Sequence, residues 1–270
     1  METGGIWTHW HTHPDVLLGL LLLQGTYLLG IGPVRQRYKL SDVIESRQIA
    51  SFTLGVIIIF LSLVSPLHVL GDEYLFSAHM IQHVLLTLIA PPLLIVGTPG
   101  WLIRPLFRLK FLFRLAKLIT NPIIAFSVFN LVFSLWHIPS LYNLSVTNHG
   151  IHIAEHLIFI VTAVIMWWPL MSNMSELPRL IYPLQMVYLF LLSVAQIIAF
   201  ATITFSSEPL YEWYTKSPTL WNISPLVDQQ IGGIIMKIGG ATLFLTLFVI
   251  IFFRWFNEEE RKTRLDKEKE

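Results

Sequence analysis

Two pairs of histidines are spaced so that each pair lies on one face of a helix. His79 and His83 are four residues apart, and so are His152 and His156. Side chains at positions i and i+4 of a helix lie one above the other, so two imidazoles at this spacing can bind one metal ion together. We therefore predict that these four histidines are metal ligands.

Residues next to the pairs extend this chemistry. His149 lies one turn before His152, and Glu155 lies between the members of the second pair, where a carboxylate can orient an imidazole or bind the ion itself. Met80 could add a thioether, and imidazole with thioether suits copper better than magnesium or calcium. The chain has no cysteine, which excludes thiolate ligands and disulfides.

Further polar positions are candidates that also have plainer explanations. His137 is a candidate ligand, but His137 and His68, each taken singly, are typical of polar groups at the level of the lipid headgroups. Asp228 is a candidate ligand and equally a candidate N-cap for the helix that follows it. The HWHTH run at residues 9–13 could also capture a metal.

The elements that hold these residues must belong to a membrane protein. The chain has 270 residues, of which 54% are hydrophobic and 13% are charged. A soluble domain carries about 25% charged residues, so this chain lacks the charge to cover a water-facing surface. We expect the lipid bilayer as its surroundings, and the net charge of +1 gives no indication of a nucleic-acid partner.

Seven segments are long and apolar enough to cross a bilayer, which takes roughly 20 residues. They are Val16–Gly32, Ala50–Leu70, Ala78–Ile103, Ile123–Asn143, His152–Met171, Ile181–Phe205 and Ile231–Phe256. The third should kink or break at Pro91 and Pro92, where neighbouring helices must satisfy the freed carbonyls. The predicted fold is an all-α membrane bundle of about seven helices, with residues 1–256 as one domain and residues 257–270 as a charged tail that can continue the last helix.

Basic residues predict how the bundle is oriented. Of the 18 Lys and Arg residues, 16 fall in the loops before the second, fourth and sixth segments or at the C-terminal end. Loops rich in Lys and Arg stay on the cytoplasmic side, so we predict an outer N-terminus and a cytoplasmic C-terminus. All ten histidines then fall in the outward half.

Four separated motifs give the chain a family resemblance. They are SAHMIQHVLLTLIAPPLLIVGTPGW from Ser77, WHIPSLYN from Trp136, HGIHIAEHLIFIVTAVIMWWPL from His149 and DQQIGGIIM from Asp228. In this order they resemble the CtaG family of bacterial cytochrome c oxidase assembly factors, the multi-span family associated with the caa-type oxidase. The resemblance runs from about Trp10 to Trp255, and the lack of cysteine sets the chain apart from the single-span copper chaperone of the same name.

The resemblance implies a multi-pass protein of the bacterial plasma membrane, with no catalytic residues, that helps to assemble a haem–copper cytochrome c oxidase. It implies copper delivery or insertion, with oxidase subunits as partners and an extracytoplasmic copper donor. The polar positions of the family's motifs map onto His79, Gln82, His83, His137, His149, His152, Glu155, His156, Asp228 and Gln229.

Three other functions remain open at this point. Histidines on neighbouring helices could supply axial ligands to a haem, which makes a haem-binding or haem-handling protein an alternative. A transporter or membrane enzyme is less supported, because the chain has no inverted repeat and IHIAEHL lacks the HExxH motif. A metal-free scaffold for an oxidase subunit would use the same histidines for hydrogen bonds to partner loops.

Overall fold

The computed structural model describes residues 3–8, 10, 13–41 and 43–268, so His9 and His11 lie outside the described residues. The described part of the chain consists of helices and their connecting loops and contains no β-strand. In it, six helices are long and apolar enough to span a membrane, and α8 (Lys110–Ile119) with α9 (Pro122–Trp136), bent by 69°, forms a seventh if counted as one span. The predicted all-α membrane bundle of about seven helices is confirmed.

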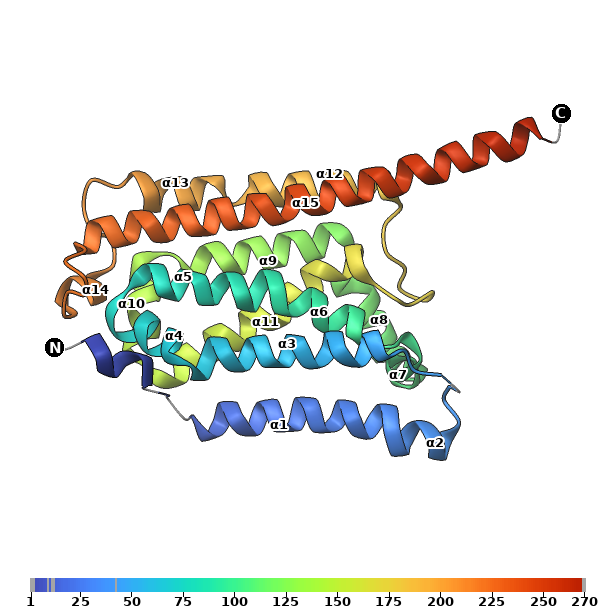
Figure 1. The fold of residues 1–270 in the computed structure, drawn as a ribbon, viewed down its shortest axis with the longest axis horizontal. Coiled ribbons are helices and arrows are strands. Elements are labelled where there is room, and N and C mark those ends of the chain that lie inside the picture. Colours follow the sequence, from blue (N-terminus) through green and yellow to red (C-terminus); the bar gives the residue numbers. More distant parts are fainter. Residues whose placement is uncertain (1–2, 9, 11–12, 42, 269–270) are drawn as a thin grey trace.

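The spanning helices run side by side along one direction (Figure 1). They are α1 (Pro14–Leu29), which continues through a π-helical turn at Gly30–Val34 into α2 (Arg35–Tyr38), then α3 (Ser46–Val64), α5 (Phe76–Val84) with α6 (Ala90–Gly97), α11 (His149–Met171), α12 (Tyr182–Ala195) with α13 (Ile197–Phe205), and α15 (Pro225–Lys267). The short helices α4 (Pro66–Val69), α10 (Pro139–Thr147) and α14 (Glu212–Lys216) gather at one end of the bundle, and α2 and α7 (Gly100–Ile103) lie at the other. The first turn, Thr3–Thr8, and the segment Arg104–Arg108 are 3₁₀-helical.

The third span does not break at its two prolines. A π-helical turn at Leu85–Ile89 precedes Pro91 and Pro92 and joins α5 to α6. Proline has no N–H, so Pro91 leaves the carbonyl of Thr87 without its helical partner. The indole Nε1 of Trp167, on α11, donates to that carbonyl at 2.8 Å. Of the predicted kink or break, the break does not occur: a widened turn keeps the span continuous, and a neighbouring helix satisfies the freed carbonyl as predicted.

Close contact between α3 and α6 depends on Gly97. A Cβ atom at this position would overlap the backbone of Phe52 in α3. The hydroxyl of Tyr27, from α1, donates to the Gly97 carbonyl at 2.9 Å. These contacts join the first three spans at the end of the bundle that carries α2 and α7.

Lys237 lies inside the last span, where an ammonium needs a polar partner. The facing span is interrupted at Gln196, between α12 and α13. Lys237 donates to the Ser193 carbonyl at 2.7 Å, beside this interruption. The irregular turn in one helix thus supplies the acceptor for the cation in the next.

The last helix is much longer than its apolar part. It runs from Pro225 to Lys267 and projects beyond the rest of the bundle (Figure 1). Ion pairs one turn apart support the projecting end, with Lys262 3.1 Å from Glu258 and Arg264 2.5 Å from Glu260. The expectation that the charged tail continues the last helix is confirmed, while its cytoplasmic location stays a prediction.

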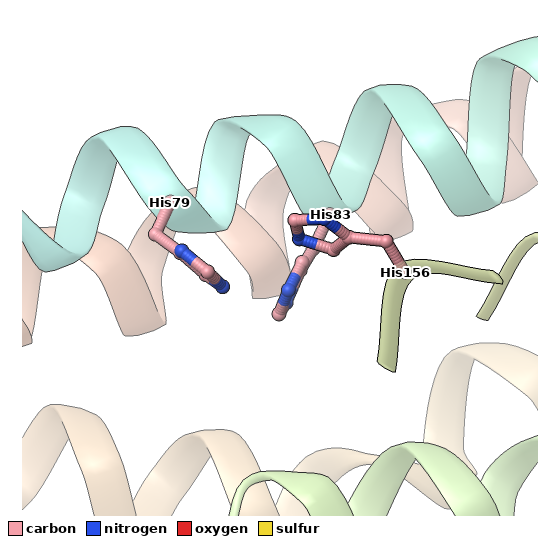
Figure 2. Close-up of side chains that lie close together, drawn as sticks. All are labelled: His79, His83 and His156. Atoms are coloured by element: carbon pink, nitrogen blue, oxygen red, sulfur yellow. The ribbon is translucent and has the colours of Figure 1, made fainter. Parts of the chain in front are cut away.

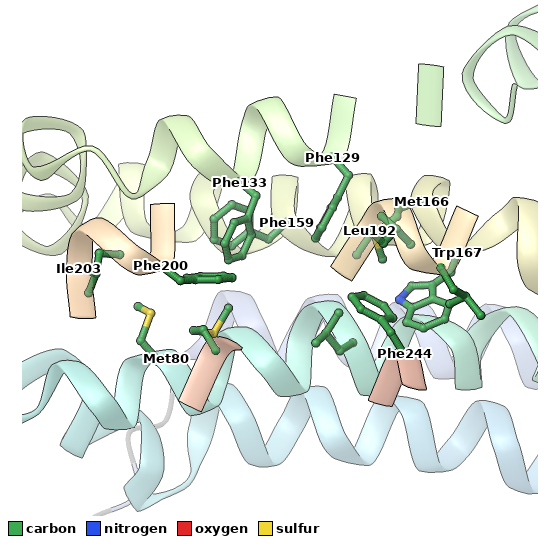
Figure 3. Close-up of a cluster of buried hydrophobic side chains, with 14 of the residues drawn as sticks. Met80, Phe129, Phe133, Phe159, Met166, Trp167, Leu192, Phe200, Ile203 and Phe244 are labelled. Atoms are coloured by element: carbon green, nitrogen blue, oxygen red, sulfur yellow. The ribbon is translucent and has the colours of Figure 1, made fainter. Parts of the chain in front are cut away.

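An apolar core fills the space between α5, α9, α11, α13 and α15. Figure 3 shows its side chains, among them Met80, Phe133, Phe159, Trp167 and Phe244, all buried. Through this core α5 packs one of its faces against α15. The histidines of α5 lie on another face, toward α11.

Candidate metal centre

The eight described histidines form one continuous cluster. Each contacts at least one other, with ring centroids 4.4 to 6.4 Å apart. They come from the residue before α1, from α4 and α5, from the first turns of α11, and from the residue after α9. These are His13, His68, His79, His83, His137, His149, His152 and His156. The cluster lies at the end of the bundle opposite the basic loops near α2 and α8 (Figure 1).

Three histidines converge in the protein interior. His79 and His83 come from α5 and His156 comes from α11, and Figure 2 shows their rings turned toward one another. One ring nitrogen from each lies within 4.8 Å of the others. The exposed fractions are 0%, 0% and 5%, so all three ligand atoms are removed from water. We call this group the inner triad.

A second group forms around Asp72. Its two carboxylate oxygens lie 3.6 Å from Nδ1 of His79 and 3.4 Å from Nδ1 of His152. One ligand atom each from Asp72, His79 and His152 lies within 4.8 Å of the others. His79 thus belongs to both groups, and the predicted pair His152 and His156 is divided between them.

Asp72 and Gln82 also fix His68. The Gln82 amide nitrogen donates to the Ser62 carbonyl at 2.7 Å and to Nδ1 of His68 at 3.0 Å. Because Nδ1 of His68 accepts, its proton is carried by Nε2, which lies 3.3 Å from Asp72. A Cβ at Gly71 would overlap the Gln82 side chain, so the backbone can pass this close to Gln82 only because residue 71 is glycine.

Glu155 and His137 border the inner triad on its deeper side. Ser145 donates to one carboxylate oxygen of Glu155, and the other oxygen lies 3.7 Å from Nε2 of His83. At this distance the two atoms form no hydrogen bond, so Glu155 lies next to the imidazole that it would orient once a metal is bound. Nδ1 of His137 hydrogen-bonds to the Phe133 carbonyl at 2.7 Å, and its ring centroid is 5.3 Å from that of His83.

Asp228 supports the site from outside it. Its carboxylate accepts from the backbone N–H of Phe76 at 2.6 Å, from the N–H of Ser77 at 3.2 Å and from the Ser77 hydroxyl. These are the first N–H groups of α5, so Asp228 caps the helix that carries His79 and His83. The prediction that Asp228 is the N-cap of its own helix is wrong, because Ser224, followed by Pro225, begins that helix one turn earlier. Asp228 belongs to none of the groups of converging ligand atoms among the described residues.

Met80 also lies away from the histidines. Its side chain is fully buried in the apolar core and reaches α15, where it lies 3.1 Å from the position of a Cβ at Gly232. One residue along a helix turns the side chain by about 100°, which carries Met80 off the face of His79 and His83. The arrangement therefore offers imidazole and carboxylate ligands but no thioether.

His149 lies at the surface rather than in the buried groups. Its Nε2 is 4.0 Å from a carboxylate oxygen of Asp15, and its ring stacks on that of His13 at 5.1 Å. One ligand atom from each of these residues lies within 4.8 Å of the others. We call His13, Asp15 and His149 the outer group.

Buried polar atoms without hydrogen-bond partners concentrate at the centre. Within the described part of the chain they include both ring nitrogens of His79 and of His83, and Nε2 of His137, His152 and His156. Each such atom costs about 1–3 kcal/mol when it is left without a partner. A metal ion fits this arrangement, because it binds neutral imidazole nitrogens that point toward one position.

The flanking histidines are held neutral. Burial lowers the pKa of His68 to about 4, although the nearby Asp72 carboxylate acts in the opposite direction. Burial likewise lowers the pKa of His137 to about 4, and its hydrogen bond to the Phe133 carbonyl opposes this only in part. Near pH 7 both rings are therefore in the form that can bind a metal.

Sequence reasoning missed Asp72 and the place of His68 in the cluster. Their spacing of four residues was a readable signal, since it is the same spacing as in the two predicted pairs. The signal was weak because the two residues follow an apolar segment, where His68 reads as a headgroup-level residue. In the structure α3 ends at Val64, and α4 with the π-helical turn Leu70–Tyr74 folds both side chains inward.

Comparison with protein families decides the identity of the chain. The family model described as cytochrome c oxidase caa3 assembly factor matches residues 25–258. The chain belongs to this family. The resemblance drawn from the four motifs is thereby confirmed, and oxidase subunits follow as partners from the family's role in assembly.

The matched residues of the family include the inner triad and the Asp72 group, and they end at residue 258, at the start of the charged tail. His13 and Asp15 precede the matched range. Comparison with curated proteins and with solved structures finds no significant match. With six to seven apolar helices in the part of it that the structure describes, the chain is a multi-pass membrane member of the assembly-factor family.

Proposed function

We propose that this assembly factor binds a copper ion in the inner triad and hands it to an oxidase subunit. The observation that carries the proposal is the convergence of three buried imidazoles, from His79, His83 and His156, within 4.8 Å. Both ring nitrogens of His79 and His83, and Nε2 of His156, have no hydrogen-bond partner among the described residues. The carboxylate oxygens beside them are those of Asp72, 3.6 Å from His79, and Glu155, 3.7 Å from His83. A scaffold without metal gives no reason to bury these groups together.

The donor set favours copper. Magnesium and calcium prefer sites made of oxygen ligands, whereas imidazole suits copper and zinc, and copper binds most strongly among the divalent first-row metals. The oxidase that members of this family assemble is a copper enzyme, which gives the ion a destination. Because Met80 lies elsewhere, the proposed ligands are nitrogen, with carboxylate oxygens of Asp72 and Glu155 3.6 Å from His79 and 3.7 Å from His83.

The direction of transfer follows from the predicted topology. The histidines lie at the end of the bundle away from the basic loops, which is the outer end if those loops are cytoplasmic. The site would then receive copper from an extracytoplasmic donor at the bacterial plasma membrane. It would present the ion at outer-leaflet depth to an oxidase subunit in the same bilayer.

Haem is the alternative ligand, and the geometry favours copper over it. Two axial histidines must face each other across a porphyrin, but the rings of the inner triad are centred 4.4 to 5.8 Å apart. Phe159 packs against His83 with ring centroids 4.8 Å apart, so aromatic side chains border the same space. A Soret band in the purified protein would support the haem alternative.

The proposal is tested in cells that make the oxidase. His83→Gln removes one ligand of the triad and retains a side chain that can hydrogen-bond to Glu155. Met80→Leu, in the same helix turn and equally buried, is the matched control. We expect oxidase purified from His83→Gln cells to carry less copper per haem, at equal membrane levels of the assembly factor, and the Met80→Leu oxidase to be normal. Normal copper content with His83→Gln would favour the scaffold and overturn the proposal.

A further inference from the structure

The outer group has the features of a metal site of its own. His13 precedes α1, Asp15 lies in its first turn, and His149 begins α11, so two separate helices contribute to it. Two imidazoles and one carboxylate offer ligand atoms within 4.8 Å of one another. A lone surface ion pair would not require the second imidazole, which stacks on the first at 5.1 Å.

A chain of imidazoles connects this group to the interior. The ring of His13 is centred 5.2 Å from that of His68, and His68 is 5.9 Å from His152. The His152 ring is centred 5.4 Å from that of His79, the residue shared by the two buried groups. Each step is short enough for a bound ion to gain a new ligand before it loses an old one.

Exposure is high in the outer group, lower at Asp72 and zero at His79. The side chains of His149 and Asp15 are 63% and 46% exposed, that of Asp72 is 22% exposed, and that of His79 is 0% exposed. Each position also has a carboxylate, namely Asp15, Asp72 and Glu155 in turn. An ion that moves inward can therefore exchange water for protein ligands in stages, with a carboxyl group beside it at every stage.

A cavity runs along this series. It has a volume of about 400 Å³ and is lined by His13, His68, His149, His152 and His156 together with apolar side chains of α1, α3 and α11. The outer group and part of the inner triad thus border one space. The cavity gives the imidazoles a common access route that does not cross the packed core of Figure 3.

We infer that His13, Asp15 and His149 form a copper-acquisition site, from which the ion passes by ligand exchange through the Asp72 group to the inner triad. The inference rests on the proposed function, since it assumes that the inner triad takes up copper. It adds a second binding site and a direction of loading. No bond other than metal–ligand bonds changes, and the ion keeps its oxidation state along the path.

Rapid mixing of the full-length protein in detergent with copper(I) held by a coloured chelator tests the route. We expect two phases of chelator bleaching in the wild type, a fast one at the outer group and a slower one at the inner triad. The double variant Asp15→Asn, His149→Ala should lose the fast phase and load the inner triad roughly tenfold or more slowly, because the outer group raises the effective concentration of the ion. Its final inner occupancy should match the wild type.

Two further variants complete the design. Glu212→Gln breaks an exposed ion pair with Lys216 at the same end of the bundle, and it should load as the wild type does. His83→Gln should retain the fast phase and lose the slow one. Loading of the double variant at the wild-type rate overturns the uptake route alone, whereas a wild-type protein that takes up no copper overturns the proposed function as well.

Discussion

Gly232 sets how closely α15 approaches the helix that carries the inner triad. A Cβ atom there would lie 2.5 and 2.7 Å from two ring carbons of Phe76 and 3.1 Å from Cγ of Met80. Carbon atoms in contact are normally about 3.5–4.0 Å apart, so Gly232→Ala must displace the Phe76 ring. That ring is 1% exposed and stacks on Tyr211 at 4.5 Å, which leaves it no space to move into.

The cost of this overlap can be estimated. Overpacking a buried site costs typically about 1–3 kcal/mol, and the rigid neighbours of Gly232 favour the upper end. Alanine in a helix interior regains about 1 kcal/mol relative to glycine. The net loss in the free energy of unfolding is about 2 kcal/mol, or roughly 4–8 °C in Tm for a chain of this size. Displacing Phe76, at the start of α5, should also weaken copper binding.

Gly239, two turns along the same helix, is the matched control. A Cβ there would meet only Val84, at 3.8 and 4.0 Å, which is ordinary contact. Gly239→Ala should therefore retain the helical gain and leave Tm unchanged or a few degrees higher. The assay is thermal unfolding of both variants in the same detergent. Equal shifts for the two substitutions would refute the reasoning that close α5–α15 packing depends on Gly232.

Three further predictions concern the surroundings of the site. Glu155→Gln should weaken copper affinity by about 10- to 100-fold in chelator competition. The control Glu176→Gln, which breaks an exposed ion pair with Arg104, should leave the affinity unchanged. Equal affinities of the two variants would exclude an orienting role for Glu155. Asp228→Ala should lower the free energy of unfolding by about 1–3 kcal/mol, because two N–H groups of α5 lose their acceptor. Asp228→Asn should lower it less. Thermal unfolding in which both variants match the wild type would contradict the role of Asp228 as the cap of α5. Burial lowers the pKa of His68 from 6.5 to about 4. Below pH 6.5 the unfolded chain therefore binds a proton at His68, whereas in the metal-free folded protein this residue stays neutral down to about pH 4. Acidification from pH 7 to pH 5 should therefore reduce the free energy of unfolding by on the order of 2 kcal/mol from this residue, and His68→Gln should flatten the dependence; an unchanged pH slope would rule His68 out as its source.

The spans could be predicted from the sequence because hydropathy and length act locally. The ends of the spans depend on neighbours instead. Pro91 and Pro92 suggested a break, but a π-helical turn together with the Trp167 indole keeps the helix continuous. The last helix begins at Pro225 because Ser224 supplies the cap, which no apolar pattern marks.

The site could be predicted where one helix sets the geometry. The spacing of His79 and His83 was sufficient to predict that their side chains lie together, since both belong to α5 and to the same triad. Which residues of other helices join the site depends on contacts between helices, and this could not be predicted from the sequence. His156 joins the triad while His152 turns to Asp72, and Asp228 caps α5 from a distance of about 150 residues along the chain. The position of Met80 directly after His79 already turns it off the face of the pair, whereas its packing against Gly232 is not revealed by the sequence alone.

The central claim is that His79, His83 and His156 bind copper. X-ray absorption spectroscopy at the copper edge of the loaded, full-length protein tests it most directly, with the outer group removed by Asp15→Asn and His149→Ala. The account predicts one copper ion with imidazole ligands from three histidines and no sulfur neighbour, a spectrum unaltered by Met80→Leu, and no bound copper with His83→Gln. A sulfur neighbour, or a spectrum that His83→Gln leaves unchanged, would contradict it.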